Sequence, residues 1–221
     1  MLLIDIHTHC CATRSVGVSI KNYHESFSSI SENEICTAGL HPLYLSAHNA
    51  EAAFNSLKIN VLKKSVVAIG ECGLDSLCGT DLDLQQKYFR IQLMLAQELN
   101  KPVILHCVRM HELALYIIQE LKITVPVVFH GFNKKWKIAE KIIKRNHYLS
   151  FGSALFTNSS IASVLQSCPL DKIFLETDES DISITALYEK AAAIKNITVE
   201  NLADKIYENA VHFFGARIFV T

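Results

Sequence analysis

The chain has 221 residues, of which 50% are hydrophobic, and its formal net charge is −1. This size and composition predict one sizeable core in a single domain over residues 1–221, with no linker, repeat or low-complexity tract. The near-neutral charge argues against long-range capture of a polyanion, and no apolar run approaches the ~18–20 residues that span a bilayer.

Apolar runs with the character of β-strands recur along the chain. We expect strands over residues 2–6, 16–20, 35–40, 66–70, 102–105, 126–129, 148–152 and 172–177. Several of these runs are continuous in Val, Ile and Leu, which is typical of parallel strands that are covered on both faces.

Helical patterns lie between most of these strands. The clearest covers residues 83–100, with apolar side chains at spacings of three to four and with Asp83 and Gln86 as an N-cap and its capping partner. Further helices are expected over residues 51–64, 111–121, 134–146, 159–167, 183–195 and 199–214. Residues 11–34 are too few and too Ser-rich for two full strand–helix units, so we expect the first helix to be missing or reduced to a loop.

The alternation of strands and helices predicts an α/β protein with a parallel sheet. Eight such strands favour a closed (β/α)8 TIM-type barrel with an abbreviated first strand–helix unit. An open doubly wound sheet is the alternative, but no G-x-G-x-x-G motif follows a strand. The chain is short for a barrel, which typically has ~250 residues, and the abbreviated first unit accounts for the difference.

A histidine or a carboxylate follows several of the predicted strands. Residues i and i+2 of a strand point the same way, so His7 and His9 share one side, with Asp5 in phase behind them. A lone His-x-His carries little information, but further strands end in these residues: Glu71, His106, His130 and Asp178. Catalytic residues of a barrel lie at the C-terminal ends of its strands, so these side chains are candidates for a metal site.

Six motifs follow one another along the chain. They are D-x-H-x-H at 5–9, G-x-H-P at 39–42, G-E-x-G-L-D at 70–75, P-V-I-L-H at 102–106, H-G-F at 130–132 and E-T-D at 176–178. In this order they resemble the TatD family of metal-dependent hydrolases, and the similarity runs from residue 2 to about residue 215. The resemblance implies a barrel that holds two divalent ions and hydrolyses DNA or other phosphoesters.

The resemblance also implies which residues bind the two ions, when the metal-binding positions of the family motifs are transferred to this sequence. His7, His9, Glu71 and Asp178 would hold one ion, and Glu71, His106 and His130 the other, with Glu71 as the bridge. Four imidazoles and two carboxylates suit Zn²⁺ or Mn²⁺, whereas Mg²⁺ accepts so many nitrogen ligands less readily. Glu71 and Asp178 are also the candidate catalytic residues, since Asp178 is placed both to bind an ion and to take a proton from the attacking water.

Three further residues are candidates for substrate contact, and each has a structural alternative. His41 precedes Pro42 and would either contact substrate or stabilise the turn. Arg109 would either clamp a phosphate or cap a helix. Lys134 would either contribute to an anion site at a helix N-terminus or remain a solvated surface lysine.

Two enzymatic functions remain open. The first is a phosphodiesterase or deoxyribonuclease, which contacts DNA or a small phosphoester locally. The second is hydrolysis of a C–N or carboxylic ester bond in a small metabolite on the same metal centre, as related barrels perform it. The segment after Asp178 lacks the Pro- and Arg-containing loop usual in the family, so the resemblance does not decide the substrate. A non-catalytic metal-binding or partner-binding role is disfavoured, since all the implied ligand positions are filled.

Seven cysteines without a C-x-x-C pair fit neither a disulfide framework nor a zinc finger. The N-terminus also lacks the basic region and the cleavage pattern of a signal peptide. We therefore expect a cytoplasmic protein with no membrane partner, present as a monomer or a weak oligomer.

Overall fold

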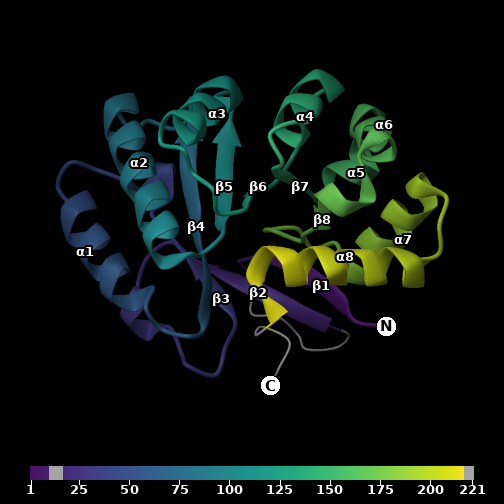
Figure 1. Ribbon diagram of the computed structural model, residues 1–221, viewed down its shortest axis with the longest axis horizontal. Helices are drawn as coiled ribbons and strands as arrows, with labels where there is room; N and C mark the ends of the chain where they lie inside the picture. Colours follow the sequence, from purple (N-terminus) through teal and green to yellow (C-terminus); the bar gives the residue numbers. More distant parts are fainter. Residues whose placement is uncertain (10–16, 217–221) are drawn as a thin grey trace. The chain divides into compact units, whose positions relative to one another are not determined.

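The computed structural model describes residues 1–9 and 17–216 (Figure 1). The strands are β1 Leu3–Thr8, β2 Gly17–Tyr23, β3 Cys36–Ala38, β4 Val66–Asp75, β5 Val103–Val108, β6 Val127–Phe129, β7 Tyr148–Phe151 and β8 Ile173–Leu175. They form an eight-stranded sheet in the order of the sequence. A parallel bridge between Thr8 and Asp178 joins the end of β1 to the segment that follows β8. This strand order is that of a (β/α)8 barrel and confirms the predicted fold class.

Helices follow the strands from β3 onward. They are α1 Ala50–Asn60, α2 Leu82–Leu99, α3 His111–Glu120, α4 Trp136–Ile143, α5 Ala154–Thr157, α6 Ser159–Ser167, α7 Ile184–Lys195 and α8 Val199–Phe214. Residues 17–216 also contain three short 3₁₀ turns: η1 Phe27–Ser29, η2 Pro42–Tyr44 and η3 Leu170–Lys172. Helix α5 was not expected, because its four residues are too few to show a helical period.

The first part of the chain is abbreviated, as the sequence indicates. Residues 24–35, between β2 and β3, contain the 3₁₀ turn η1 and no α-helix. The connection from β1 to β2 consists of residues 9–16, of which 10–16 lie outside the described residues.

Strand β4 is longer than predicted, and Glu71 therefore lies inside the strand rather than after its end. The strand continues because it stays paired with β5 as far as Asp75, opposite Val108. This close pairing depends on Gly73, which has φ +150° and where an added Cβ would lie 1.9 Å from the His106 carbonyl oxygen. Only glycine permits that backbone conformation and that approach.

The starts of α2 and α4 also differ from the expectation. Helix α2 begins after Asp81, whose carboxylate accepts a hydrogen bond of 3.0 Å from the Leu84 N–H, so the assignment of Asp83 as the N-cap was wrong. Helix α4 begins at Trp136, so Lys134 precedes the helix instead of opening it. Several residues near a helix start can serve as an N-cap, and the direction from which the chain enters decides among them.

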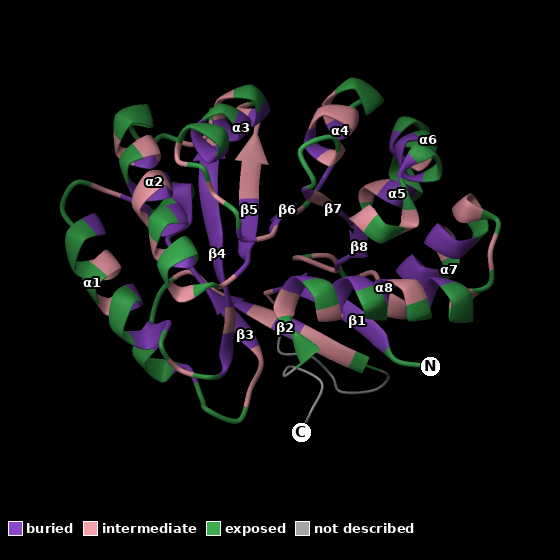
Figure 2. Ribbon diagram, viewed as in Figure 1, coloured by how far each residue is buried: buried purple, intermediate pink, exposed green. Residues whose placement is uncertain are grey.

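The chain divides into two compact units, residues 1–21 with 128–221 and residues 22–127. In the first unit, α7 and α8 pack against β1; in the second, α2 packs against β4 and α3 against β5. Figure 2 shows β1 and β4 almost wholly buried, while the outer faces of α1 and α2 are exposed. The expectation of a single domain over 1–221 stays a prediction.

Buried polar contacts hold the C-terminal helices to the strands of the first unit. The Tyr188 hydroxyl of α7 accepts a hydrogen bond of 3.0 Å from the Ile4 N–H and donates one of 3.1 Å to the Ile4 carbonyl oxygen. In α8, the Asn209 amide donates to the carbonyl oxygens of Leu170 at 2.8 Å and Ile173 at 3.0 Å. Each contact gives a backbone group in or beside the core a hydrogen-bond partner, which offsets the cost of removing that group from water. Among the described residues, no helix is long and apolar enough to cross a membrane.

We expect His147 to make the folding stability depend on pH. Burial, together with the positive charges of Arg145 and Lys172, lowers the pKa of His147 from 6.5 to about 4. The unfolded chain therefore binds this proton first, so the stabilisation is present above pH ~6.5 and falls by about 3 kcal/mol as the pH drops towards ~4. Urea unfolding between those pH values should show a smaller decline for His147→Gln than for the wild type. Parallel declines would mean that His147 is not the responsible group.

Candidate metal sites

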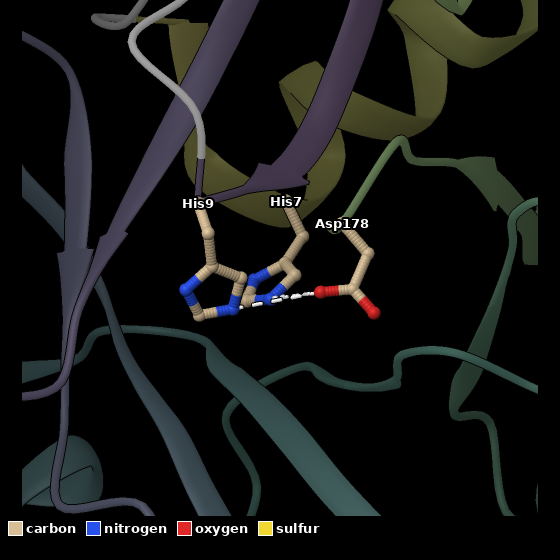
Figure 3. A group of neighbouring side chains, drawn as sticks. All are labelled: His7, His9 and Asp178. Carbon is tan, nitrogen blue, oxygen red and sulfur yellow. Dashed lines mark ion pairs between the residues drawn. The ribbon is translucent and has the colours of Figure 1, made fainter. Parts of the chain in front are cut away.

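In the first unit, two histidines and one aspartate face one another (Figure 3). His7 and His9 extend from the end of β1 with ring centroids 5.0 Å apart, as the alternation of the strand predicts. The Asp178 Oδ1 atom lies 3.6 Å from His7 Nε2 and 3.5 Å from His9 Nε2. The three side chains thus turn nitrogen and oxygen donors towards a common point.

The backbone around Asp178 places this carboxylate. The Asp178 N–H donates to the His7 carbonyl oxygen at 3.0 Å, and the His9 N–H donates to the Asp178 carbonyl oxygen at 3.2 Å. Asp178 has φ 54°, a left-handed conformation that is uncommon outside glycine but that aspartate adopts more readily than most residues. Residues far apart in the sequence are therefore joined by main-chain hydrogen bonds.

Asp5 of β1 holds the segment of Thr177 and Asp178 in place. It is buried, and its carboxylate accepts hydrogen bonds from the Thr177 hydroxyl at 2.6 Å and from the Thr177 N–H at 3.0 Å. Burial raises the pKa of Asp5 to about 6, although the hydrogen bonds from Thr177 oppose that rise. Asp5 thereby fixes the residue that precedes Asp178.

His130 and Glu176 complete the donors of the first unit. The ring of His130 lies 4.4 Å from that of His7, and its Nδ1 atom is 3.5 Å from Glu176 Oε1. Donor atoms of His130, Glu176 and Asp178 all lie within 4.8 Å of one another. Glu176 is fully buried, and it also accepts a hydrogen bond from the Gly131 N–H. Burial opposes the ionisation of Glu176, but the neighbouring rings of His130 and His7 outweigh it and lower the pKa of this carboxyl.

Glu176 was not predicted as a candidate donor from the sequence. The motif E-T-D indicated only Asp178 as a ligand. The available signal was the spacing, since residues 176 and 178 are two apart, as His7 and His9 are.

In the second unit, His41, Glu71 and His106 form a cluster with donor atoms within 4.8 Å of one another. Glu71 Oε1 lies 2.8 Å from His106 Nδ1 and 3.3 Å from His41 Nε2. The Glu71 side chain is 4% exposed, and its N–H donates to Asn22 Oδ1 at 2.7 Å. His41 also accepts a hydrogen bond of 3.1 Å at Nδ1 from the Leu43 N–H, so it caps η2 while its other nitrogen faces Glu71.

A second carboxylate contacts His106 from the opposite side. Asp75 Oδ2 lies 3.0 Å from His106 Nε2, and Gln85 holds the Asp75 backbone through hydrogen bonds of 2.8 Å and 3.1 Å. Burial opposes the ionisation of Asp75, but the hydrogen bond with His106 and backbone N–H donors lower its pKa overall. A carboxylate on the second nitrogen of a histidine commonly orients that ring towards a metal. The motif at 70–75 contained Asp75, but its spacing gave no indication of this partner.

The donor sets fit a divalent ion of intermediate softness. Imidazole nitrogens and carboxylate oxygens together suit Zn²⁺, Mn²⁺ or a similar ion. Of the predicted ligands, the first unit brings together His7, His9, His130 and Asp178, and the second brings Glu71 beside His106. Of the predicted substrate contacts, only His41 belongs to one of these clusters. Arg109 is exposed just after β5, and Lys134 is half-buried ahead of α4.

A (β/α)8 barrel with histidines and carboxylates clustered at or near the ends of its strands is typical of metal-dependent hydrolases. The family model described as TatD related DNase matches residues 5–215. The chain belongs to this family.

Individual relatives agree with this assignment. The chain is 29% identical over 199 residues to an uncharacterized metal-dependent hydrolase of Methanocaldococcus jannaschii, covering 84% of this chain and 78% of the relative. It is 30% identical over 203 residues to the 3'-5' ssDNA/RNA exonuclease TatD of Pantoea ananatis, covering 81% of this chain and 77% of the relative. Among solved structures, the TatD homologue YJJV of Escherichia coli aligns with a TM-score of 0.82 at 23% identity, over 97% of this chain and 98% of that one.

Proposed function

We propose that this metal-dependent hydrolase cleaves phosphodiester bonds in DNA or a related small phosphoester, using two divalent ions. The ligands would be His7, His9, Glu71, His106, His130 and Asp178, and the ions Zn²⁺, Mn²⁺ or Mg²⁺. The observation that carries the proposal is the gathering of imidazole and carboxylate donors within 4.8 Å of one another in each unit. The name of the Pantoea ananatis relative, an exonuclease on single-stranded DNA and RNA, supports the substrate class.

Asp178 is the residue we propose as the general base. When bound, divalent ions supply Lewis acidity towards water and towards a phosphoryl oxygen. The Asp178 side chain is 40% exposed, whereas that of Glu71 is 4% exposed. Asp178 can therefore face both an ion and solvent and accept the proton of the attacking water. Glu71 would act as a ligand.

The cationic candidates would contact the substrate phosphate. Arg109 follows His106 by three residues and Lys134 follows His130 by four, so each stands on the loop after a proposed ligand. His41 would contribute at the second cluster through its Nε2 atom. The net charge of −1 favours local contact with the substrate over long-range capture of a polyanion. The enzyme we propose is cytoplasmic and is a monomer or a weak oligomer.

Metal analysis and a substrate panel test the proposal. Protein purified without chelator should carry close to two divalent ions per chain, and should hydrolyse bis-(p-nitrophenyl) phosphate and single-stranded DNA. Dialysis against EDTA should remove both metal and hydrolysis, and adding Mn²⁺ or Zn²⁺ should restore both. Metal-dependent hydrolysis of amide or carboxylic ester substrates alone would favour the alternative function, and a chain with neither metal nor metal-stimulated activity would refute both.

A further inference from the structure

We propose that Tyr44, stacked on His24 beside the cluster of His41, Glu71 and His106, is a platform on which a base of the substrate stacks. This inference rests on the proposed phosphodiesterase function and narrows its substrate to compounds in which a nucleobase is linked to the phosphate.

The platform is a pair of parallel rings with one exposed member. The ring centroids of His24 and Tyr44 are 4.3 Å apart, and the two planes meet at 17°. Tyr44 is nevertheless 47% exposed, and the adjacent Leu43 is 54% exposed. A flat aromatic ring supported by a second ring suits stacking with any of the bases, because every base presents a π-face.

The position of the pair connects it with the candidate metal site. His24 follows β2, and Tyr44 ends the turn η2 that follows β3, so both belong to loops at the C-terminal ends of strands, where barrel enzymes bind substrate. The ring of Tyr44 is 5.5 Å from that of His41, whose Nε2 lies 3.3 Å from Glu71 Oε1. The imidazole of His41 therefore lies between the Tyr44 ring and Glu71, which is a proposed metal ligand. In a nucleotide a single sugar lies between the base and the phosphate. A base stacked on Tyr44 would therefore place its phosphate near Glu71.

The turn that carries Tyr44 is held in place by several hydrogen bonds. The Tyr44 N–H donates to the His41 carbonyl oxygen at 3.1 Å, and the Tyr44 carbonyl oxygen accepts from Asn49 Nδ2 at 3.0 Å. The next carbonyl oxygen, of Leu45, accepts from the Thr80 hydroxyl at 3.2 Å. Binding a base would therefore require little additional ordering of this segment, which favours affinity.

The experiment compares ligands with and without bases on the metal-loaded protein. The probes are a short fluorescent oligodeoxythymidylate with a slowly cleaved phosphorothioate backbone and the same backbone with abasic sugars, and binding is followed by fluorescence anisotropy. Tyr44→Ala is the test variant, and Tyr44→Phe keeps the ring. Tyr116→Ala is the matched control, because Tyr116 is 59% exposed on α3 in the same unit.

We expect Tyr44→Ala to weaken binding of the oligodeoxythymidylate by about 5- to 100-fold while binding of the abasic strand stays the same. Tyr44→Phe and Tyr116→Ala should bind both probes as the wild type does. Thymidine monophosphate is then added as a competitor of the fluorescent oligodeoxythymidylate. If the platform accepts a single nucleotide, this competitor should displace the probe from the wild type but not from Tyr44→Ala. If the platform requires a strand, the competitor should displace the probe only weakly from every variant.

Equal affinity of the wild type for both probes would refute the proposed platform. An equal loss of affinity for both probes in Tyr44→Ala would refute it as well. Binding is measured separately from hydrolysis, so the two proposals fail separately. A wild-type protein that hydrolyses bis-(p-nitrophenyl) phosphate but binds both probes equally refutes only the platform. Absence of phosphodiester hydrolysis in the wild type refutes the proposed function.

Discussion

Asp178→Asn should keep the fold and some of the bound metal, with one ion held more weakly, while lowering kcat by about 100- to 10,000-fold. The amide of asparagine is nearly isosteric with the carboxylate and offers an oxygen to an ion, and the backbone hydrogen bonds that join residue 178 to His7 and His9 remain possible. The amide does not accept the proton of the attacking water. The rate should therefore fall further than the metal content, and both must be measured on the same preparation.

Asp181→Asn is the matched control for Asp178→Asn. Asp181 is an exposed carboxylate three residues further along the same segment, so its substitution makes the same change in charge. We expect this control to retain near wild-type kcat. If Asp178→Asn holds two ions and still turns over its best substrate at close to the wild-type rate, Asp178 is not the base.

Glu71→Gln should affect metal binding more severely. The Glu71 carboxylate contacts both His41 and His106 and is nearly buried, so the substitution removes the negative charge from the cluster of the second unit. The family resemblance also assigns Glu71 to both ions. We therefore expect the metal content after dialysis to fall from about two ions towards none, with hydrolysis at background and with a normal far-ultraviolet circular dichroism spectrum.

Glu120→Gln controls for the general loss of a carboxylate in the second unit. Glu120 pairs with Arg90 at 2.7 Å on the surface, where an ion pair contributes little to stability. Its substitution should leave metal content and activity unchanged. A folded Glu71→Gln protein that retains two ions would exclude Glu71 as a ligand.

The sequence by itself determined the class of fold and most of the elements. Helices α6 and α8 begin and end where their apolar spacing predicts, at 159–167 and 199–214. Each predicted strand is present. Several are buried along their whole length and are therefore mostly apolar, which the sequence shows, whereas β2 is only partly buried. The pairing of His7 with His9 was likewise readable, since alternation within one strand is a local property.

Only the tertiary structure decided which of these groups meet. The contacts of Asp75 with His106 and of Glu176 with His130 join different strands, and no spacing within one segment encodes them. Strand β4 continues beyond Glu71 because it is paired with β5. Thr177 donates a hydrogen bond to Asp5 because the end of β1 lies beside the segment that follows β8. Local pattern sets how a segment folds and which way its side chains point, whereas the partners of those side chains depend on long-range packing.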